Sequence, residues 1–189
     1  MAASRPMRRI INSTYISLDG VIENPHLWPS SGSSEGRGDA IQTDLLLACD
    51  AVLMGRRTYE GFAPVWPTRS GDPASDQINS MRKYVVSSTL RDPEWNNTTV
   101  ITENPIEAIR ELKEQPGKDL VQYGFGRLSH ALVEHGLLDE LRLWLHPLLV
   151  GKGGPDDLLY RDNRLTQFRL QDATTLANGI VILGYEVAR

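Results

Sequence analysis

Short apolar segments alternate with amphipathic segments along most of the chain. The apolar segments have the length of buried strands, whereas the segments between them repeat apolar residues at helical spacing. This alternation favours an α/β fold around a largely parallel sheet. We predict strands at 10–16, 51–54, 84–86, 98–102, 118–124 and 140–150, and helices at 39–50, 55–62, 105–115 and 126–136, with a further short helix before residue 84.

The C-terminal segment 168–188 has the pattern of two strands joined at Asn178-Gly179. This dipeptide suits the positive φ angles of a tight hairpin. An antiparallel hairpin beside parallel strands makes a mixed sheet, and in such sheets ligands bind beyond the carboxyl ends of the strands. We therefore expect the functional residues to gather at that edge.

Two polar segments interrupt the pattern. Residues 23–38, ENPHLWPSSGSSEGRG, are too polar to form core and too long for a passive connection, so we interpret them as a mobile active-site loop. A disordered surface insertion is the alternative. Residues 63–75 form a second loop with three prolines. Asp39 follows the first loop and is the expected N-cap of the next helix.

Composition narrows the class of protein. The 189 residues are 40% hydrophobic and 23% charged, as in a globular protein with one domain, which we place at 9–189 after a flexible N-terminus at 1–8. The net charge is −4 and no basic stripe follows a helix or strand, so we expect no nucleic-acid partner. The single cysteine, Cys49, and the lack of a signal peptide or membrane span favour a cytoplasmic location.

Three donor-rich segments each follow a predicted strand. GRRT at 55–58 combines helix-start N–H groups with two guanidinium groups, which suit the ribose 2′-phosphate of NADP. SST at 87–89 adds hydroxyls, and the glycines of GFGRL at 124–128 would let a pyrophosphate approach the backbone. Each segment has an alternative interpretation. GRRT could be a solvated corner, and SST could only cap its strand. GFGRL is an incomplete glycine motif, because Ser129 occupies the position of its last glycine. The candidate cofactor residues in these segments are Gly55, Arg56, Arg57, Thr58, Ser87, Ser88, Gly124, Phe125, Gly126, Arg127 and Leu128.

Five motifs occur in an order that resembles the dihydrofolate-reductase-like superfamily: SLDG, LMGRRTYEG, KYVVSSTL, YGFGRL and GLLDELRLWLHPLLVGKG. They look most similar to the branch of the reductase domain in the riboflavin-pathway deaminase-reductase. The resemblance implies a three-layer sandwich and NADPH as cofactor, with the first strand, including Thr14, and Ile22 beside the nicotinamide. It also implies that a homodimer could form through the late strands. The chain lacks the H-x-E and P-C-x-x-C motifs of the accompanying zinc deaminase.

Candidates for substrate chemistry are few. Asp39 stands before Gly55 at a spacing similar to that of the active-site carboxylate in dihydrofolate reductases, and burial beside an apolar ring would raise its pKa. Asp19 lies in the SLDG turn, where related pyrimidine reductases keep an Asp. Alternatively, Asp39 only caps its helix and Asp19 only forms an Asp-Gly turn. Trp28, Tyr59 and Trp66 could stack on a planar ring, although Tyr59 and Trp66 could equally be core. The four histidines, His26, His130, His135 and His146, lack metal-site spacing, so we expect no metal.

The favoured hypothesis is an NADPH-dependent reductase that transfers hydride to a small pterin-, pyrimidine- or flavin-like heterocycle. One alternative is the riboflavin-pathway 5-amino-6-(5-phosphoribosylamino)uracil reductase, which would need basic residues for its phosphate; Lys152 is the obvious one. Another alternative is a non-catalytic NADP-binding module.

Overall fold

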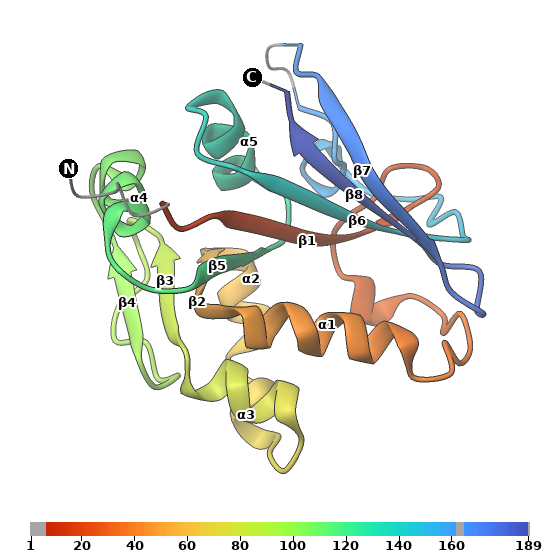
Figure 1. Ribbon diagram of the computed structural model, residues 1–189, viewed down its shortest axis with the longest axis horizontal. Coiled ribbons are helices and arrows are strands. Elements are labelled where there is room, and N and C mark those ends of the chain that lie inside the picture. The colour runs from red at the N-terminus through yellow and green to blue at the C-terminus, as the bar shows by residue number, and fades with distance from the viewer. Residues whose placement is uncertain (1–6, 162–164, 189) are drawn as a thin grey trace, which may run out of the picture.

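An eight-stranded sheet runs through the whole structure, with strand order β4-β3-β2-β5-β1-β6-β8-β7 (Figure 1). The computed structural model describes residues 7–161 and 165–188. Neighbouring strands from β4 to β6 are parallel, and β8 is antiparallel to both β6 and β7. The strands are β1 (Ile10–Ser17), β2 (Cys49–Gly55), β3 (Arg82–Val86), β4 (Thr98–Ile101), β5 (Asp119–Tyr123), β6 (Glu140–His146), β7 (Phe168–Thr175) and β8 (Val181–Val187).

Helices cover both faces of the sheet, and Figure 1 shows α5 and α1 on opposite sides of β1. The helices are α1 (Arg37–Ala48), α2 (Arg56–Phe62), α3 (Pro73–Ser80), α4 (Pro105–Glu114) and α5 (Arg127–Glu134). Side chains of α4 and α5 share one core cluster with the sheet, whereas α1, α2 and α3 share another. The predicted three-layer α/β fold with a mostly parallel sheet and a C-terminal hairpin is confirmed.

The alternation of β1 divides the two cores. Ile10 and Ile16 belong to the cluster of α4 and α5, and Ile11 belongs to the cluster of α1, α2 and α3. Successive side chains of a strand point to opposite faces, so Asn12 and Thr14 share the α5 side, while Ser13 and Tyr15 share the α1 side. The two faces of β1 therefore contribute side chains to two different sides of the molecule.

Helix α1 begins earlier than predicted. Its N-cap is Gly36, and Asp39 lies in the first turn. The prediction of Asp39 as N-cap is therefore wrong, although a carboxylate in the first turn still interacts favourably with the helix dipole. The side chains that α1 buries, Leu45 and Leu46, lie one turn apart from the partly buried Ile41 and Gln42 and so share their face.

Several other boundaries differ from the predictions for local reasons. Strand β6 ends at His146 rather than at residue 150, because Pro147 has no N–H to donate to a ladder. Helix α3 begins inside the loop predicted at 63–75, where the Asp72 side chain accepts from Ser75 N at 2.9 Å. In the β7–β8 turn only Gly179, at φ 83°, takes a positive φ. Residues 176–180 separate the two strands, so the turn is longer than the two-residue hairpin expected at Asn178-Gly179.

Of the N-terminal segment expected to be flexible, residues 1–6 lie outside the described residues. Arg8 is only 7% exposed and forms an ion pair with Asp50. The segment expected to be a mobile loop contains a 3₁₀ helix, Pro25–Leu27, and Asn178 Nδ2 donates to Gly32 O at 3.1 Å. The C-terminal turn therefore holds this segment at Gly32.

Candidate functional site

The carboxyl ends of β2, β3 and β5 lie side by side, because β2 pairs in parallel with both neighbours. Side chains connect the first two ends: Arg56 Nη1 donates to Thr89 Oγ1 at 2.5 Å, and Arg56 Nε donates to Glu60 Oε1 at 2.6 Å. Arg56 is half exposed and held on both sides by these contacts. Its guanidinium group is therefore positioned at the edge where an anion would approach.

The third strand end joins this edge through Thr58 and Gly124. Thr58 Oγ1 donates to Tyr123 O at 3.4 Å. Gly124 has φ 77°, and a Cβ at this position would lie 2.8 Å from Thr58 Oγ1. Only glycine satisfies both the backbone conformation and the close approach. The structure therefore brings together all three donor-rich segments that the sequence singled out.

A buried polar network fixes the Gly124 turn from the α5 side. Asn12 Nδ2 donates to Gln122 Oε1 at 3.0 Å and to Gly124 O at 2.8 Å. Ser129 Oγ also donates to Gly124 O at 3.0 Å, and Gln122 Nε2 donates to Ser129 Oγ at 2.9 Å. Such satisfied networks make a turn rigid. Sequence reasoning missed Asn12 and Gln122, whose signal was a polar residue inside an otherwise apolar strand.

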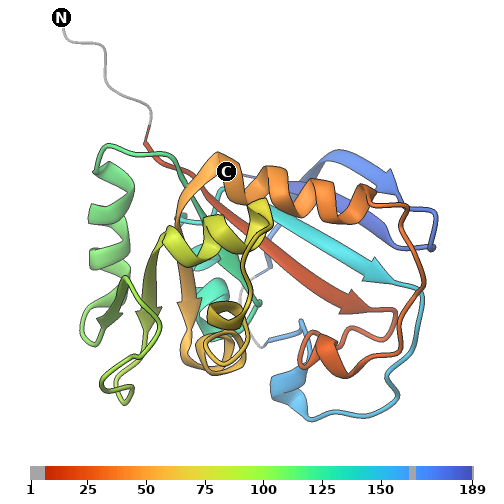
Figure 2. The ribbon, with the colours of Figure 1, turned by 90° about the horizontal axis from the view of Figure 1, so that it is seen from below.

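Thr14 belongs to the same network. Its hydroxyl donates to Asn12 Oδ1 at 2.7 Å, and the residue is buried. The Thr14 hydroxyl is therefore occupied within the protein, and its expected place beside the nicotinamide stays a prediction. Ile22 is also buried and belongs to the core cluster of α4 and α5, while its N–H donates to Asp157 O at 2.8 Å. The segment after β1 thus lies beside the 3₁₀ helix Pro155–Asp157 beyond the strand ends (Figure 2).

The remaining predicted cofactor residues fall into two groups. Ser87 Oγ accepts from Thr89 N at 3.2 Å and from Leu90 N at 2.9 Å, so this buried hydroxyl shapes its own turn. Phe125 is buried in the core, and only its backbone remains for a ligand. Leu128 likewise packs against the core. The exposed donors at the edge belong to Arg57, Ser88 and Arg127, beside the backbone of Gly55 and Gly126.

Arg57 extends toward the segment after β1. Its side chain is 62% exposed, with Nη1 at 3.9 Å from Glu23 Oε1 and Nη2 at 3.7 Å from Asp157 Oδ1. Both ion pairs are long, and the Arg57 side of each is exposed, so they contribute little to stability. Arg57 therefore has charge available for an anionic ligand.

The two candidate acids do not have the predicted environment. Asp39 is exposed, so the predicted burial beside an apolar ring is not seen. Asp19 accepts from Ser17 Oγ at 2.5 Å, Gly151 N at 2.8 Å and Val150 N at 3.1 Å. These hydrogen bonds stabilise the carboxylate and lower the pKa of Asp19 to about 2. Asp19 is therefore an ionised anchor for the segment after β6 and a poor proton donor.

The predicted stacking residues separate into core and edge. Tyr59 is 4% exposed, lies 6.4 Å from the Trp95 ring and accepts from Trp95 N through its hydroxyl at 3.3 Å. Trp66 packs on Phe62 at 6.0 Å and on the Arg69 guanidinium group. Both belong to or border the core of α1, α2 and α3. The core alternative holds for Tyr59, and Trp66 lies at the margin of the same core.

Trp28 instead joins an aromatic cluster at the ends of β1 and β6. Its ring lies 5.3 Å from His146, edge to face, and His146 lies 4.7 Å from Tyr15. Burial raises the pKa of Tyr15 and lowers the pKa of His146. Sequence reasoning did not select Tyr15, and it treated His146 as surface or core, because nothing in a single sequence shows which rings meet.

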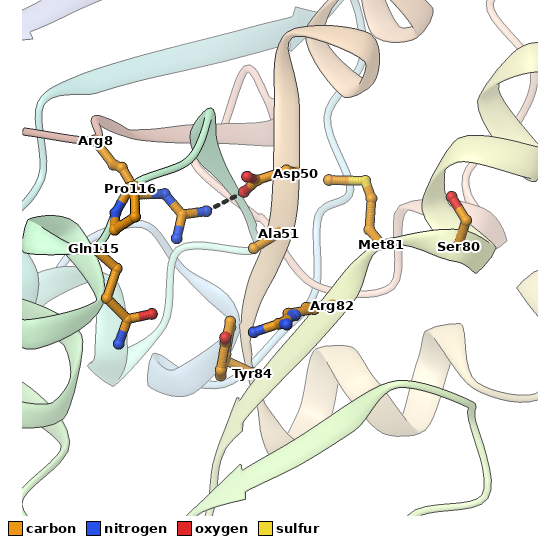
Figure 3. A pocket seen from close by; sticks show the side chains of 9 residues that line it. All are labelled: Arg8, Asp50, Ala51, Ser80, Met81, Arg82, Tyr84, Gln115 and Pro116. Atoms are coloured by element: carbon orange, nitrogen blue, oxygen red, sulfur yellow. Dashed lines mark hydrogen bonds and ion pairs between the residues drawn. The ribbon is translucent and has the colours of Figure 1, made fainter.

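A pocket of about 300 Å³ lies at the opposite, amino-terminal edge of the sheet. Figure 3 shows Arg8 paired with Asp50 at its wall, and Tyr84 and Arg82 from β3 at another side. None of the predicted site residues lines this pocket. Within 7–161 and 165–188, no group of three or more metal-ligating side chains is found, and no helix is long and apolar enough to cross a membrane.

The layers, the strand order and the glycine turn at the carboxyl edge define a three-layer α/β protein with a mostly parallel sheet. The chain belongs to the RibD C-terminal domain family, whose model matches residues 8–182. It is 30% identical over 193 residues to the uncharacterized protein YyaP of Bacillus subtilis (strain 168), and the match covers 98% of each chain.

Two solved structures share the fold. The pyrimidine reductase-like protein of Corynebacterium diphtheriae matches with a TM-score of 0.63 and 15% identity, over 96% of this chain and 92% of the other. The diaminohydroxyphosphoribosylaminopyrimidine deaminase/5-amino-6-(5-phosphoribosylamino)uracil reductase of Thermotoga maritima matches with a TM-score of 0.67 and 14% identity. That match covers 96% of this chain and 57% of the Thermotoga protein, and at these identities it supports the fold alone.

Proposed function

We propose that this protein is an NADPH-dependent reductase that transfers hydride to a small heterocyclic substrate. The observation that carries the proposal is the junction of three donor-rich strand ends, connected by the Arg56–Thr89 and Thr58–Tyr123 hydrogen bonds. Membership of the RibD C-terminal domain family supports the same class of chemistry. The single buried thiol, Cys49, needs no oxidising compartment, which supports a cytoplasmic enzyme.

Each strand end has a distinct role in this proposal. Arg56, Arg57 and Ser88 would bind the 2′-phosphate side of the nucleotide through charge-assisted hydrogen bonds. The Gly124 turn and the start of α5 would bind the pyrophosphate, because glycine lets it approach the backbone and the helix dipole favours its charge. Bound NADPH would supply the hydride, and the rigid turn behind Gly124 would fix its position against the substrate.

Proton delivery is assigned to ordered water rather than to either Asp. Asp19 is anchored as a carboxylate, and Asp39 lies exposed at the start of α1. An exposed carboxylate can still orient such a water, so Asp39 keeps an auxiliary role in the proposal.

Arg56→Gln tests the cofactor site. Loss of a charge-assisted contact to phosphate corresponds to about 1.5–3 kcal/mol, so NADPH affinity should fall roughly ten- to a hundredfold. NADH affinity should change less, because NADH has no 2′-phosphate. Arg110→Gln is the matched control, since Arg110 is similarly exposed on α4 and pairs with Glu107.

Titration of intrinsic fluorescence with NADPH and NADH measures both affinities. A protein that shows no saturable NADPH binding, or an Arg110→Gln variant as impaired as Arg56→Gln, would contradict the proposal. Saturable binding without consumption of NADPH by any pterin, pyrimidine or flavin acceptor would instead identify a non-catalytic NADP-binding module.

The riboflavin-pathway uracil reductase is the second candidate, because the chain belongs to the RibD C-terminal domain family and the Thermotoga protein that shares its fold is named for that activity. Its substrate carries a phosphoribosyl group, so it requires cations on the substrate side of the nicotinamide. Oxidation of NADPH with the phosphorylated substrate but not with its dephosphorylated form would favour this candidate over an enzyme for an uncharged ring.

A further inference from the structure

The aromatic cluster on the α1 side presents an unusual set of hydrogen-bond acceptors. Tyr15 and Trp144 are register partners on β1 and β6, with ring centroids 5.6 Å apart. The His146 ring lies 4.7 Å from Tyr15, and the Trp28 and His146 rings meet edge to face at 5.3 Å. These four rings form an aromatic wall. Trp144 and His146 are buried, whereas Tyr15 and Trp28 are only partly buried, so the rings of these two residues are the ones that a planar aromatic ligand could reach.

His146 contributes an acceptor to this wall. Its Nδ1 lies 2.9 Å from Trp144 O, and a carbonyl oxygen can only accept, so Nδ1 carries the hydrogen. Burial lowers the pKa of His146, which keeps the imidazole neutral near pH 7. The second ring nitrogen, Nε2, is therefore a lone-pair acceptor.

Gln42 contributes a second acceptor. It lies on the face of α1 that meets the sheet, and its side chain interacts with the Tyr15 hydroxyl. Gln42 Oε1 is shielded from solvent and has no hydrogen-bond partner. A buried unpaired amide oxygen costs about 1–3 kcal/mol, and a ligand that donates a hydrogen bond to it removes this cost.

Asp39 gives the same region a negative charge. Its carboxylate is close enough to raise the pKa of Tyr15 by charge repulsion, after the larger effect of burial. The charge disfavours an anionic group on the ligand and favours the positive end of N–H bonds. Three features of the wall, from Gln42, His146 and Asp39, thus select the same kind of partner.

We propose, on the basis of the reductase function above, that Gln42 and His146 bind the N–H edge of an uncharged heteroaromatic substrate stacked on Tyr15. Ring N–H or amino groups donate to Gln42 Oε1 and His146 Nε2. The Asp39 charge disfavours a phosphate-bearing substrate at this wall. The specificity therefore lies in donors on the ring edge rather than in an attached phosphate.

Trp28 controls access in this proposal. Gln42 Oε1 is already shielded, so a neighbouring side chain must move before a ring can reach it. Tyr15, His146 and Gln42 are carried by strands or a helix, whereas Trp28 follows the short 3₁₀ helix in the connection between β1 and α1. Trp28 is the member of the cluster whose backbone can shift without breaking a sheet ladder or a long helix.

Binding of two pteridines tests the proposal. Lumazine carries ring N–H donors at both positions of its pyrimidine edge, and 1,3-dimethyllumazine carries none. Each is titrated into the full-length protein, with and without saturating NADP⁺, and followed by calorimetry. We expect wild type to bind lumazine at least about tenfold more tightly than the dimethyl compound, since a buried acceptor left unpaired costs about that factor.

The variant Gln42→Leu should remove most of this preference, so that the affinities for the two compounds converge. Gln115→Leu, at an exposed position after α4, should preserve it. Equal affinities in wild type, or an equal loss of both affinities in Gln42→Leu, would overturn the proposal. If Gln42→Leu fails to fold, the wild-type comparison alone still decides. If the protein binds NADPH but neither pteridine, this inference is wrong and the proposed function is unaffected. If the protein does not bind NADPH, the proposed function itself is contradicted.

Discussion

Lys83 offers a direct test of how this fold treats a buried charge. It is 0% exposed on β3, where its Nζ donates to Asn79 O at 2.6 Å and lies 4.6 Å from the centre of the Trp95 ring. No carboxylate among residues 7–161 and 165–188 forms an ion pair with it. Burial without a counter-charge lowers the pKa of Lys83 from 10.5 to about 8.

The shift sets the size and sign of the effect. The pKa difference corresponds to about 3 kcal/mol, which we reduce to about 2 kcal/mol because buried charges relax and are partly screened. Between about pH 8 and pH 10.5 the unfolded chain binds the Lys83 proton more tightly than the folded protein does. The contribution of Lys83 to the free energy of unfolding therefore rises with pH across this window.

The variant Lys83→Met removes this dependence. At any single pH, the difference in unfolding free energy between wild type and the variant also includes the lost hydrogen bond to Asn79 O. The informative quantity is therefore how this difference changes with pH. Relative to the variant, wild type should gain about 2 kcal/mol in unfolding free energy from about pH 7 to about pH 10.

Urea unfolding followed by tryptophan fluorescence measures these free energies, and Lys152→Met is the control because Lys152 is exposed. A difference between Lys83→Met and wild type that stays constant to within about 0.5 kcal/mol over this range would refute the reasoning. Such a result would mean that Lys83 is protonated to the same extent in the folded and unfolded chains.

Two further predictions concern the cofactor turn and the late strands. Gly124→Ala should lower the free energy of unfolding by about 1–3 kcal/mol, because of its left-handed φ and the contact with Thr58, and urea titration measures the loss. Gly61→Ala, in helix α2 with open space around it, should be neutral or stabilising; an equal loss in both variants would contradict the account. We also expect a homodimer, because an apolar sheet face on the α5 side is only partly covered, and Leu183→Asp should yield monomers in light scattering. Leu47→Asp, exposed on α1, should leave the mass unchanged, and a monomeric wild type would disprove this prediction. The face comprises Leu143, Leu145, Val181, Leu183 and Tyr185, with Leu170 at its margin.

The edge of the sheet was predictable because each of its donor-rich segments directly follows an apolar strand. Parallel strands place their carboxyl ends together, so GRRT, SST and GFGRL needed only the correct strand order to meet. The roles of single side chains were less accessible. Ser87 and Thr14 carry the hydroxyls that such a site would use, yet both hydroxyls bond within the protein.

The substrate side was largely hidden from the sequence. Tyr59 and Trp28 look alike as candidate stacking residues, and only the packing of α2 against Trp95 shows that Tyr59 is core. The start of α1 depended on the backbone of Gly36, which moved Asp39 from the cap into an exposed first turn. Long-range neighbours decide burial, and a single sequence does not contain them.

Strand β1 links the two halves of the candidate site. On one face, Asn12 holds the carbonyl of Gly124, so the turn proposed for the pyrophosphate has a fixed position relative to β1. On the other face, Ser13 Oγ accepts from Trp144 Nε1 at 3.1 Å, and Tyr15 supports His146. One strand therefore positions both the turn proposed for the pyrophosphate and the aromatic wall proposed for the substrate. Because the backbone of β1 pairs with both β5 and β6, a shift of either neighbour would move a nicotinamide and a substrate ring relative to each other. The proposed hydride transfer would require that distance to be kept short, and a doubly paired central strand is the element of this fold best able to keep it.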